Sequence, residues 1–121
     1  MVWAILVVAP RHRLGVGVVL FNEKHQVLLL RHVFHPTFPW GLPGGWLNRH
    51  EDPAVGALRE LWEETGLTAV LGPIVLIQRE NFPSHLAMAY LAYEPANSLK
   101  LSNEIIEAVW TDLDALPNLL P

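Results

Sequence analysis

The sequence predicts an α/β sandwich built on a mixed β-sheet. Apolar segments rich in valine, leucine and isoleucine lie both before and after a single segment with helical periodicity. That helical segment carries signals for both of its ends, whereas the apolar segments are short and separated by turn residues. Strands on both sides of a helix are typical of a sheet with helical cover. With 121 residues, the chain suits one compact domain, which we expect to span residues 1–121.

Composition supports a folded core and limits the possible partners. Hydrophobic residues make up 51% of the chain and charged residues 17%, so a disordered chain is excluded. The absence of cysteine excludes disulfides and thiolate metal sites. A net charge of −4 argues against a general nucleic-acid binder, and we expect no nucleic acid or membrane partner. A small anionic substrate stays compatible with this charge, because a bound metal inverts the charge locally.

The first nine residues, Met1 to Ala9, are almost wholly apolar. No basic region precedes them, so they do not resemble a signal peptide. They are also shorter than the roughly 18 apolar residues that a membrane span needs. We therefore expect a cytoplasmic protein, in which this stretch either completes the sheet or is buried in a homodimer.

Two strands and a loop are expected next. Residues 13–21 and 26–33 are apolar, and the polar turn Asn22 to His25 separates them, which predicts a hairpin. The segment from Phe34 to Gly45 contains three prolines, three glycines and three aromatic residues. This composition predicts a structured loop rather than a helix.

The helix is predicted at residues 54–65. Asp52 is a good N-cap, Pro53 suits the first helical position, and Gly66 is a typical C-terminal stop. A rotation of about 100° per residue divides the helix into two faces. The expected packing face holds Ala54, Leu58, Leu61, Trp62 and Thr65, and the opposite face holds Glu60, Glu63 and Glu64.

The remaining chain is predicted to form three strands and a helical end. The strands are residues 68–80, bent near Gly72-Pro73, then residues 85–93 and residues 105–111. Residues 95–102 are expected to be a loop. Residues 112–116 are expected to form a short helical turn that Pro117 stops.

The acidic helix face has a composition suited to metal chemistry. Glu60 and Glu64 lie one helical turn apart, and Glu63 is adjacent to both. Carboxylate oxygens suit Mg²⁺ or Mn²⁺, which also bind the phosphates of substrates. Arg59 can orient a carboxylate, and the Gly44-Gly45 turn leaves backbone open to a ligand. A metal held in this way could polarise a phosphoryl oxygen, which favours hydrolysis of a phosphoric anhydride.

Residues 45–67 resemble the Nudix box. The family pattern is Gly, five residues, Glu, seven residues, Arg-Glu-apolar, one residue, Glu-Glu, one residue and Gly-apolar. Every fixed position is matched, by Gly45, Glu51, Arg59, Glu60, Leu61, Glu63, Glu64, Gly66 and Leu67. The resemblance implies a Nudix-like α/β/α sandwich with a mixed β-sheet. It also implies an enzyme that hydrolyses a nucleoside diphosphate linked to another moiety, with Mg²⁺ or Mn²⁺ as cofactor.

The resemblance also assigns roles by position. Glu60, Glu63 and Glu64 would bind metal, with the carbonyl of Gly44 as a further ligand. Arg59 would orient these glutamates, and Glu51 would support the loop of the box. The resemblance leaves open whether Glu60 or a residue in a later loop acts on the attacking water.

Residues outside the box complete the candidate site. Glu104 and Glu107 precede the last predicted strand, and we favour Glu104 as a further ligand or the base. Arginines bind phosphate through paired donors, and the candidates for such contacts are Arg11, Arg13, Arg31 and Arg79. Trp46 and Phe82 are candidates for stacking on a base. No histidine is expected to bind metal, and His50 is the one expected nearest to the site.

The substrate is only weakly marked. Pro83 lies 16 residues after Leu67, which resembles a feature of the ADP-ribose hydrolases of the family. An ADP-ribose-like substrate is therefore slightly favoured. The alternatives are a nucleoside triphosphate pyrophosphohydrolase that removes damaged nucleotides, as MutT-like proteins do, and a module that senses a nucleotide without cleaving it.

Overall fold

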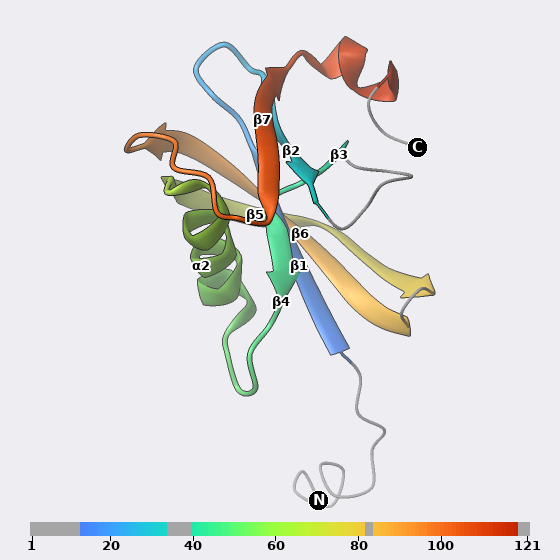
Figure 1. Cartoon of the computed structure of the whole chain (residues 1–121). Coiled ribbons are helices and arrows are strands. Elements are labelled where there is room, and N and C mark those ends of the chain that lie inside the picture. Colours follow the sequence, from blue (N-terminus) through green and yellow to red (C-terminus); the bar gives the residue numbers. More distant parts are fainter. Residues whose placement is uncertain (1–12, 34–39, 82–83, 119–121) are drawn as a thin grey trace, which may run out of the picture.

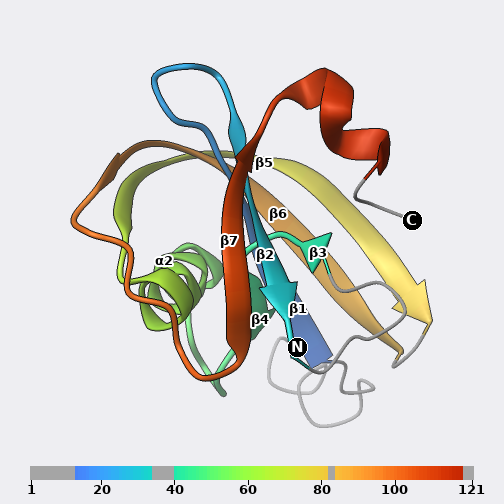
Figure 2. The same cartoon turned by 45° about the horizontal axis from the view of Figure 1, so that its top comes forward.

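A computed structural model describes residues 13–33, 40–81 and 84–118 of the chain. Its elements are two sheets, helix α2 and a short 3-10 helix (Figures 1 and 2). The strands are β1 (Arg13–Leu20), β2 (Val27–His32), β3 (Trp40–Gly41), β4 (Gly44–Trp46), β5 (Thr68–Asn81), β6 (Ser84–Ala96) and β7 (Ile105–Thr111), and the helices are α2 (Pro53–Thr65) and η1 (Leu113–Asn118).

The larger sheet is mixed, as the sequence predicts. Its strand order is β4-β1-β6-β5, with β1 and β6 parallel and the other neighbours antiparallel. The smaller sheet is antiparallel, in the order β3-β2-β7. Helix α2 lies to one side of the sheets, and η1 lies at the opposite end of β7 from the loop that precedes that strand (Figure 1). The predicted α/β class with a mixed sheet is confirmed.

The predicted hairpin of the first two strands is wrong. The polar turn forms, because the Asn22 side chain accepts hydrogen bonds from the amides of Lys24 and Gln26. Beyond the turn, however, β1 and β2 belong to different sheets and share only the isolated bridge between Phe21 and Val27. Four consecutive residues of β2, Val27 to Leu30, are buried. A strand that is buried on both faces needs hydrogen-bond partners for both of its edges, and β3 and β7 provide them here.

The core fills the space between the sheets and the helix. Alternate residues of β1 contribute one face, and the main buried cluster includes Val16, Val18, Leu20, Leu28, Leu30, Ala57, Leu61, Tyr90 and Ala92. The side chains of a β-strand point to the two faces of the sheet, whereas its backbone hydrogen bonds lie in the plane of the sheet. β1 therefore contributes to the core and also pairs with β4, which carries the glycine turn. The core thus fixes the position of Gly44 and Gly45 relative to the helix.

Helix α2 begins and ends where the sequence predicts. The Asp52 side chain accepts a hydrogen bond from the amide of Ala54, and Pro53 occupies the first turn. Gly66 adopts a left-handed conformation with φ of 74°, and its amide donates to the carbonyl of Trp62. The predicted packing face is wrong at one position, because the Trp62 side chain is exposed. Leu61 is fully buried as predicted, and Ala57, which the prediction left out of this face, is fully buried too.

Three further boundaries differ from the predictions. Strands β5 and β6 extend beyond their predicted ends, so the segment 95–96 expected to be loop belongs to β6. The bend in β5 is present, as a shift of register between Leu71 and Ile74. The helix η1 includes Pro117 rather than ending before it. None of the described helices is long and apolar enough to span a membrane.

Candidate metal and phosphate site

The carboxylates of the box gather at one cavity beside helix α2. This cavity, about 250 Å³, is lined by Glu60, Glu63, Glu64, Ser102, Asn103 and Glu104. Helix α2 supplies the first three residues, and the loop before β7 supplies the others. The structure therefore brings Glu104 to the glutamates of the box, whereas Glu107 lies within β7 and pairs at 4.0 Å with Arg31 of β2.

Backbone hydrogen bonds hold the Glu104 loop against the end of the helix. The amide of Lys100 donates to the carbonyl of Thr65 over 2.7 Å, and the amide of Ser102 donates to that of Glu64 over 3.0 Å. The helix ends in carbonyls that lack partners within the helix, so these bonds satisfy them. The amide of Val33 in turn donates to the carbonyl of Glu104. The position of Glu104 is therefore fixed from two sides.

The guanidinium of Arg59 donates hydrogen bonds to four neighbouring residues. It binds Glu51 through two hydrogen bonds, of 2.7 and 2.9 Å. It also donates to Glu60 at 3.0 Å, to Glu63 at 3.1 Å and to the carbonyl of Trp46 at 3.1 Å. This planar, multiply bonded group fixes the carboxylates more rigidly than a lysine could. The carboxylates raise the pKa of Arg59, with Glu51 as the main cause.

Glu51 connects Arg59 to the loop of the box, which is the segment 47–52 between β4 and α2. Its carboxylate accepts a hydrogen bond from the amide of Asn48 at 3.0 Å in addition to those from Arg59. These bonds, with the Arg59 side chain as the largest contribution, lower the pKa of Glu51 to about 2. Glu51 therefore stays ionised and cross-links the loop to the helix.

The glycine turn packs too closely against β1 and the Glu60 carboxylate for any side chain. The amide of Gly44 donates to Glu64 over 2.7 Å. A Cβ at Gly44 would lie 2.2 Å from the carbonyl oxygen of Val16, and one at Gly45 would lie 2.6 Å from the carboxyl group of Glu60. Glycine is therefore required by close approach at both positions.

The carboxylates are crowded and partly withdrawn from water. Burial, opposed by the Gly44 amide and reinforced by Glu60, Glu104 and Glu63, raises the pKa of Glu64 to about 7. Burial also raises the pKa of Glu60, although Arg59 opposes this effect. Burial and the mutual repulsion of the acids favour their neutral forms, and a cation bound beside them would oppose both effects. His32, rather than His50, is the histidine that lies against this cluster, with Nδ1 at 3.9 Å from Glu64.

The donor set fits a hard divalent cation. Among residues 13–33, 40–81 and 84–118, no three acidic or histidine side chains are grouped closely enough to hold an ion as they stand. Arg59 contacts one oxygen of Glu60 and one of Glu63, and each carboxylate has a second oxygen to offer. All of these donors are oxygen atoms, which Mg²⁺ and Mn²⁺ prefer.

The other predicted substrate contacts do not line the carboxylate cavity. Trp46 follows Gly45 directly, and its ring contacts His85 edge-on at 4.7 Å between centroids. Arg79 lines a separate small cavity with Ser84 and His85. Phe82, Pro83 and Arg11 lie outside the described residues, so their proposed contacts stay predictions.

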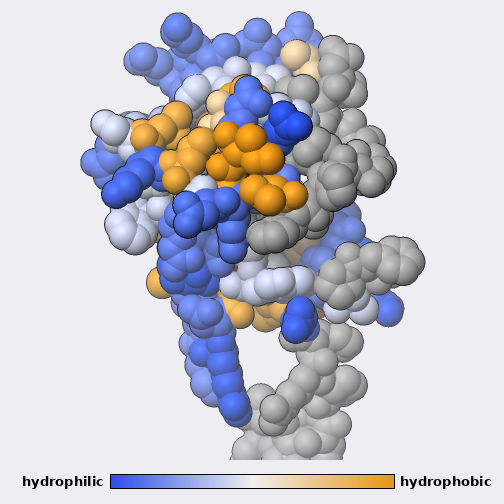
Figure 3. Space-filling view, in the orientation of Figure 1, coloured by the Kyte–Doolittle hydropathy of each residue, from blue (hydrophilic) through white to orange (hydrophobic). Residues whose placement is uncertain are grey.

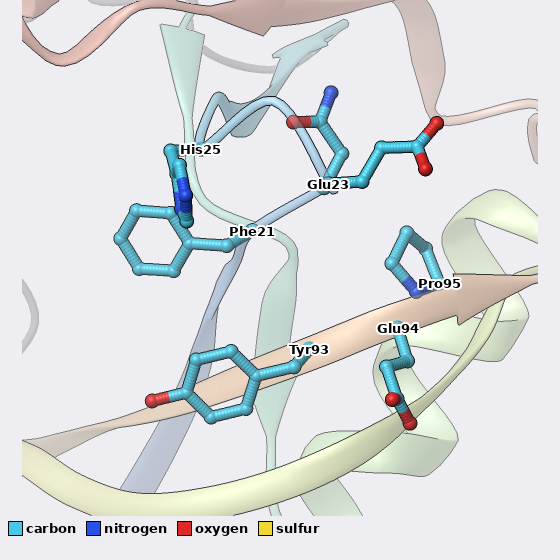
Figure 4. Close-up of a pocket in the computed structure, with 7 residues that line it drawn as sticks. Phe21, Glu23, His25, Tyr93, Glu94 and Pro95 are labelled. Carbon is cyan, nitrogen blue, oxygen red and sulfur yellow. The ribbon is translucent and has the colours of Figure 1, made fainter.

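A cavity larger than the carboxylate cavity contains no residue of the box. It measures about 750 Å³ and is lined by residues of the β1–β2 turn and of the end of β6. Figure 4 shows Phe21 and Tyr93 projecting to the same side, and their rings stack with centroids 6.4 Å apart. The carboxylate cavity is smaller, but it is lined by the box glutamates Glu60, Glu63 and Glu64, which makes it the candidate site.

The comparisons agree with the fold and the box. The NUDIX domain family matches residues 11–121, so the chain belongs to this family. An RNA pyrophosphohydrolase of Caulobacter vibrioides is 48% identical over 62 residues, which are 50% of this chain and 36% of that protein. The chain thus spans about a third of the length of this relative. A MutT-like protein of Streptomyces ambofaciens is 28% identical over 105 residues, 87% of this chain and 67% of that protein.

Solved structures share the same fold. The MutT protein of Methanosarcina mazei Go1 matches with a TM-score of 0.75 and 32% identity, covering 94% of this chain and 88% of that one. The prediction that the chain is a Nudix hydrolase is thereby confirmed at the level of the family. The activities that these names indicate are those of the relatives.

Proposed function

We propose that the protein hydrolyses a phosphoric anhydride bond in a nucleotide, with Mg²⁺ or Mn²⁺ held by Glu60, Glu63 and Glu64. The observation that carries the proposal is the cavity that these three residues line together with Glu104. Arg59 orients two of the carboxylates by donating hydrogen bonds to Glu60 and Glu63. When bound there, the metal would supply charge neutralisation for phosphate oxygens and a more acidic bound water. The carbonyl of Gly44 is a further candidate ligand.

The side chains have separate tasks in this proposal. Arg59 keeps Glu60 and Glu63 oriented, while Glu51 anchors Arg59 to the loop of the box. Glu104 enters from the opposite wall of the cavity and is suited to take a proton from an attacking water. Glu60 is the alternative base. Burial withdraws the Glu64 carboxylate from water, which strengthens the attraction of its ionised form for a cation.

The names of the relatives favour a substrate with an anhydride at a nucleotide 5′ end. The RNA pyrophosphohydrolase and the MutT-like protein support a nucleoside triphosphate or a related 5′-triphosphate over an ADP-ribose-like compound. The slight preference for ADP-ribose depends on Pro83, which lies outside the described residues. We therefore propose the 5′-triphosphate class as the main substrate.

A substrate panel tests the proposal. Nucleoside triphosphates, a dinucleoside polyphosphate, ADP-ribose and NADH are incubated with the protein and Mg²⁺ or Mn²⁺, and the products are separated by ion exchange. Turnover of the triphosphates should require the metal and fall roughly a hundredfold or more in the Glu63→Gln variant. The Glu23→Gln variant, changed in the exposed β1–β2 turn, is the matched control. Metal-independent turnover, or full activity of Glu63→Gln, would contradict the proposal, and binding without cleavage would favour a sensing module.

A further inference from the structure

A second cavity has Trp46 in its wall and contains none of the glutamates that line the carboxylate cavity. It measures about 490 Å³ and is lined by Arg13, Leu14, Trp46, Leu47, Asn48, Arg49 and His50. We call it the Arg13/Arg49 cavity. Two of its walls are the start of β1 and the loop of the box, and Figure 3 shows hydrophilic residues over helix α2 and over the loop below it.

The two arginines of this cavity are not neutralised by nearby acids. Within residues 13–33, 40–81 and 84–118, no carboxylate lies within 4.0 Å of the guanidinium of Arg13 or Arg49. Arg59 differs, because three carboxylates and a carbonyl occupy its donors. The donors of Arg59 are therefore used within the protein, whereas Arg13 and Arg49 have donors that can bind an external anion.

Trp46 joins the Arg13/Arg49 cavity to the carboxylate site. The guanidinium of Arg13 lies over the Trp46 ring at 5.1 Å from its centroid, so a cation–π contact orients it. The Trp46 carbonyl accepts a hydrogen bond from Arg59. At the preceding residue, Gly45, an added Cβ would meet the Glu60 carboxyl group. The residue that Arg13 stacks on therefore also accepts a hydrogen bond from Arg59 and directly follows the glycine turn of the proposed metal site.

We propose that the Arg13/Arg49 cavity binds a phosphate that the substrate carries beyond its scissile anhydride. This inference rests on the proposed function and deepens it. Guanidinium groups recognise phosphate through paired, charge-assisted hydrogen bonds, and the side chains of Asn48 and His50 can add donors. The substrate class is a small nucleotide with a further phosphate, on its ribose or in a second nucleotide unit. The net charge of −4 does not oppose this, because the cavity itself is locally basic.

Matched nucleotides test the cavity directly. We compare kcat/KM for a nucleoside 5′-triphosphate with that for the same compound bearing a 3′-phosphate, a 5′-triphosphorylated dinucleotide and a dinucleoside tetraphosphate. The wild-type protein should prefer at least one compound with the further phosphate. Arg13→Ala and Arg49→Ala should each reduce that preference roughly tenfold, the effect of losing one charge-assisted pair. Lys24→Ala, another exposed cation in the β1–β2 turn, is the control and should keep the preference.

The compound that responds identifies the source of the phosphate. A response of the 3′-phosphate alone indicates a monoester, a response of the dinucleotide a phosphodiester, and a response of the tetraphosphate a longer anhydride chain. Arg49→Lys should restore part of the preference, since it restores the charge without the paired donors. An unchanged preference in the folded Arg13→Ala and Arg49→Ala variants would overturn the proposal, as would a wild-type protein that prefers the plain triphosphate.

Equilibrium binding separates failure of this inference from failure of the proposed function. Titration calorimetry of the same nucleotides with the Glu63→Gln variant needs no turnover. Tighter binding of a compound with the further phosphate, lost in Glu63→Gln/Arg49→Ala and weakened by salt, supports the cavity even if nothing is hydrolysed. Equal binding of all compounds by both proteins overturns the inference, whatever the activity panel gives.

Discussion

At the scale of single residues, the site depends on how Arg59 and Glu51 are joined. Their two short hydrogen bonds form a fork that a single ammonium group cannot reproduce. Arg59→Lys should therefore lower activity or Mn²⁺ affinity by about 10- to 100-fold, the usual effect of changing a group that orients metal ligands. Calorimetric titration of Mn²⁺ and steady-state kinetics measure the two quantities. Lys100→Ala, a cation outside the site, is the control, and wild-type values for Arg59→Lys would show that charge alone suffices.

Glu64 makes the stability of the metal-free protein depend on pH. Its pKa is raised from 4.5 to about 7 on folding, so the folded state binds more protons than the unfolded state between these values. Stability should therefore fall as pH rises from about 4.5 to 7, by on the order of 3 kcal/mol from this group. Glu64→Gln should remove that loss, as measured by urea unfolding with a chelator present. Parallel curves for wild type and Glu64→Gln across this range would contradict the prediction, and Glu23→Gln should behave as wild type.

The box residues were predictable from sequence because their spacing is local. A helix places Glu60, Glu63 and Glu64 on neighbouring turns whatever the rest of the chain does. The positions of His32 and Arg49 were missed because both depend on contacts between residues far apart in sequence. His32 reaches Glu64 only through the pairing of β2 with β7, which brings together residues far apart in sequence. Arg49 is an ordinary surface residue until the loop of the box is folded against Arg13.

At the scale of elements, helix α2 is defined by its caps. Asp52 accepts a hydrogen bond from the amide of Ala54 and satisfies one of the free donors of the first turn. Asp52→Ala should lower the free energy of unfolding by about 1 kcal/mol. Chemical denaturation followed by circular dichroism measures the change, and Asp114→Ala in η1 is the matched control. A loss no greater than that of the control would show that packing alone fixes the start of the helix.

The two faces of α2 differ in what they contribute. Leu61 is fully buried, whereas the adjacent Trp62 has 59% of its surface exposed. Leu61→Ala should cost about 2–5 kcal/mol, because it leaves a cavity in the core. Trp62→Gln should change stability by no more than about 0.5 kcal/mol. Comparable losses in the two variants, measured by urea unfolding, would mean that Trp62 packs against something beyond the described residues.

The error at Trp62 has a physical origin. Helical periodicity identifies a wide apolar stripe, but the boundary of the stripe depends on which elements pack against it. Here Gly56 and Ala57 bring the helix close to the box loop and the sheet, with a Cβ at Gly56 meeting the Leu47 side chain. The buried face is therefore rotated toward these small residues and away from Trp62. The hairpin error is similar, since local turn signals do not specify which sheet a strand joins.

At the scale of the whole molecule, the carboxylate cavity joins segments that are distant in sequence. Helix α2 provides one wall and the loop before β7 provides the other, held together by the backbone bonds of Lys100 and Ser102. A cation that binds acids from both walls binds only the folded chain. Its binding free energy must then add to the stability of the fold, by about 2.7 kcal/mol at a concentration one hundred times its dissociation constant.

This linkage distinguishes Glu104 from Glu107. Both glutamates lie at the start of the last strand region, but only Glu104 lines the cavity, whereas Glu107 is paired with Arg31. Mn²⁺ should raise the melting temperature of the wild-type protein and of Glu107→Gln to a similar extent. It should raise that of Glu104→Gln distinctly less, because one oxygen donor is lost from the second wall. Thermal unfolding with and without Mn²⁺ checks this, and an equal shift in Glu104→Gln would assign the metal to helix α2 alone.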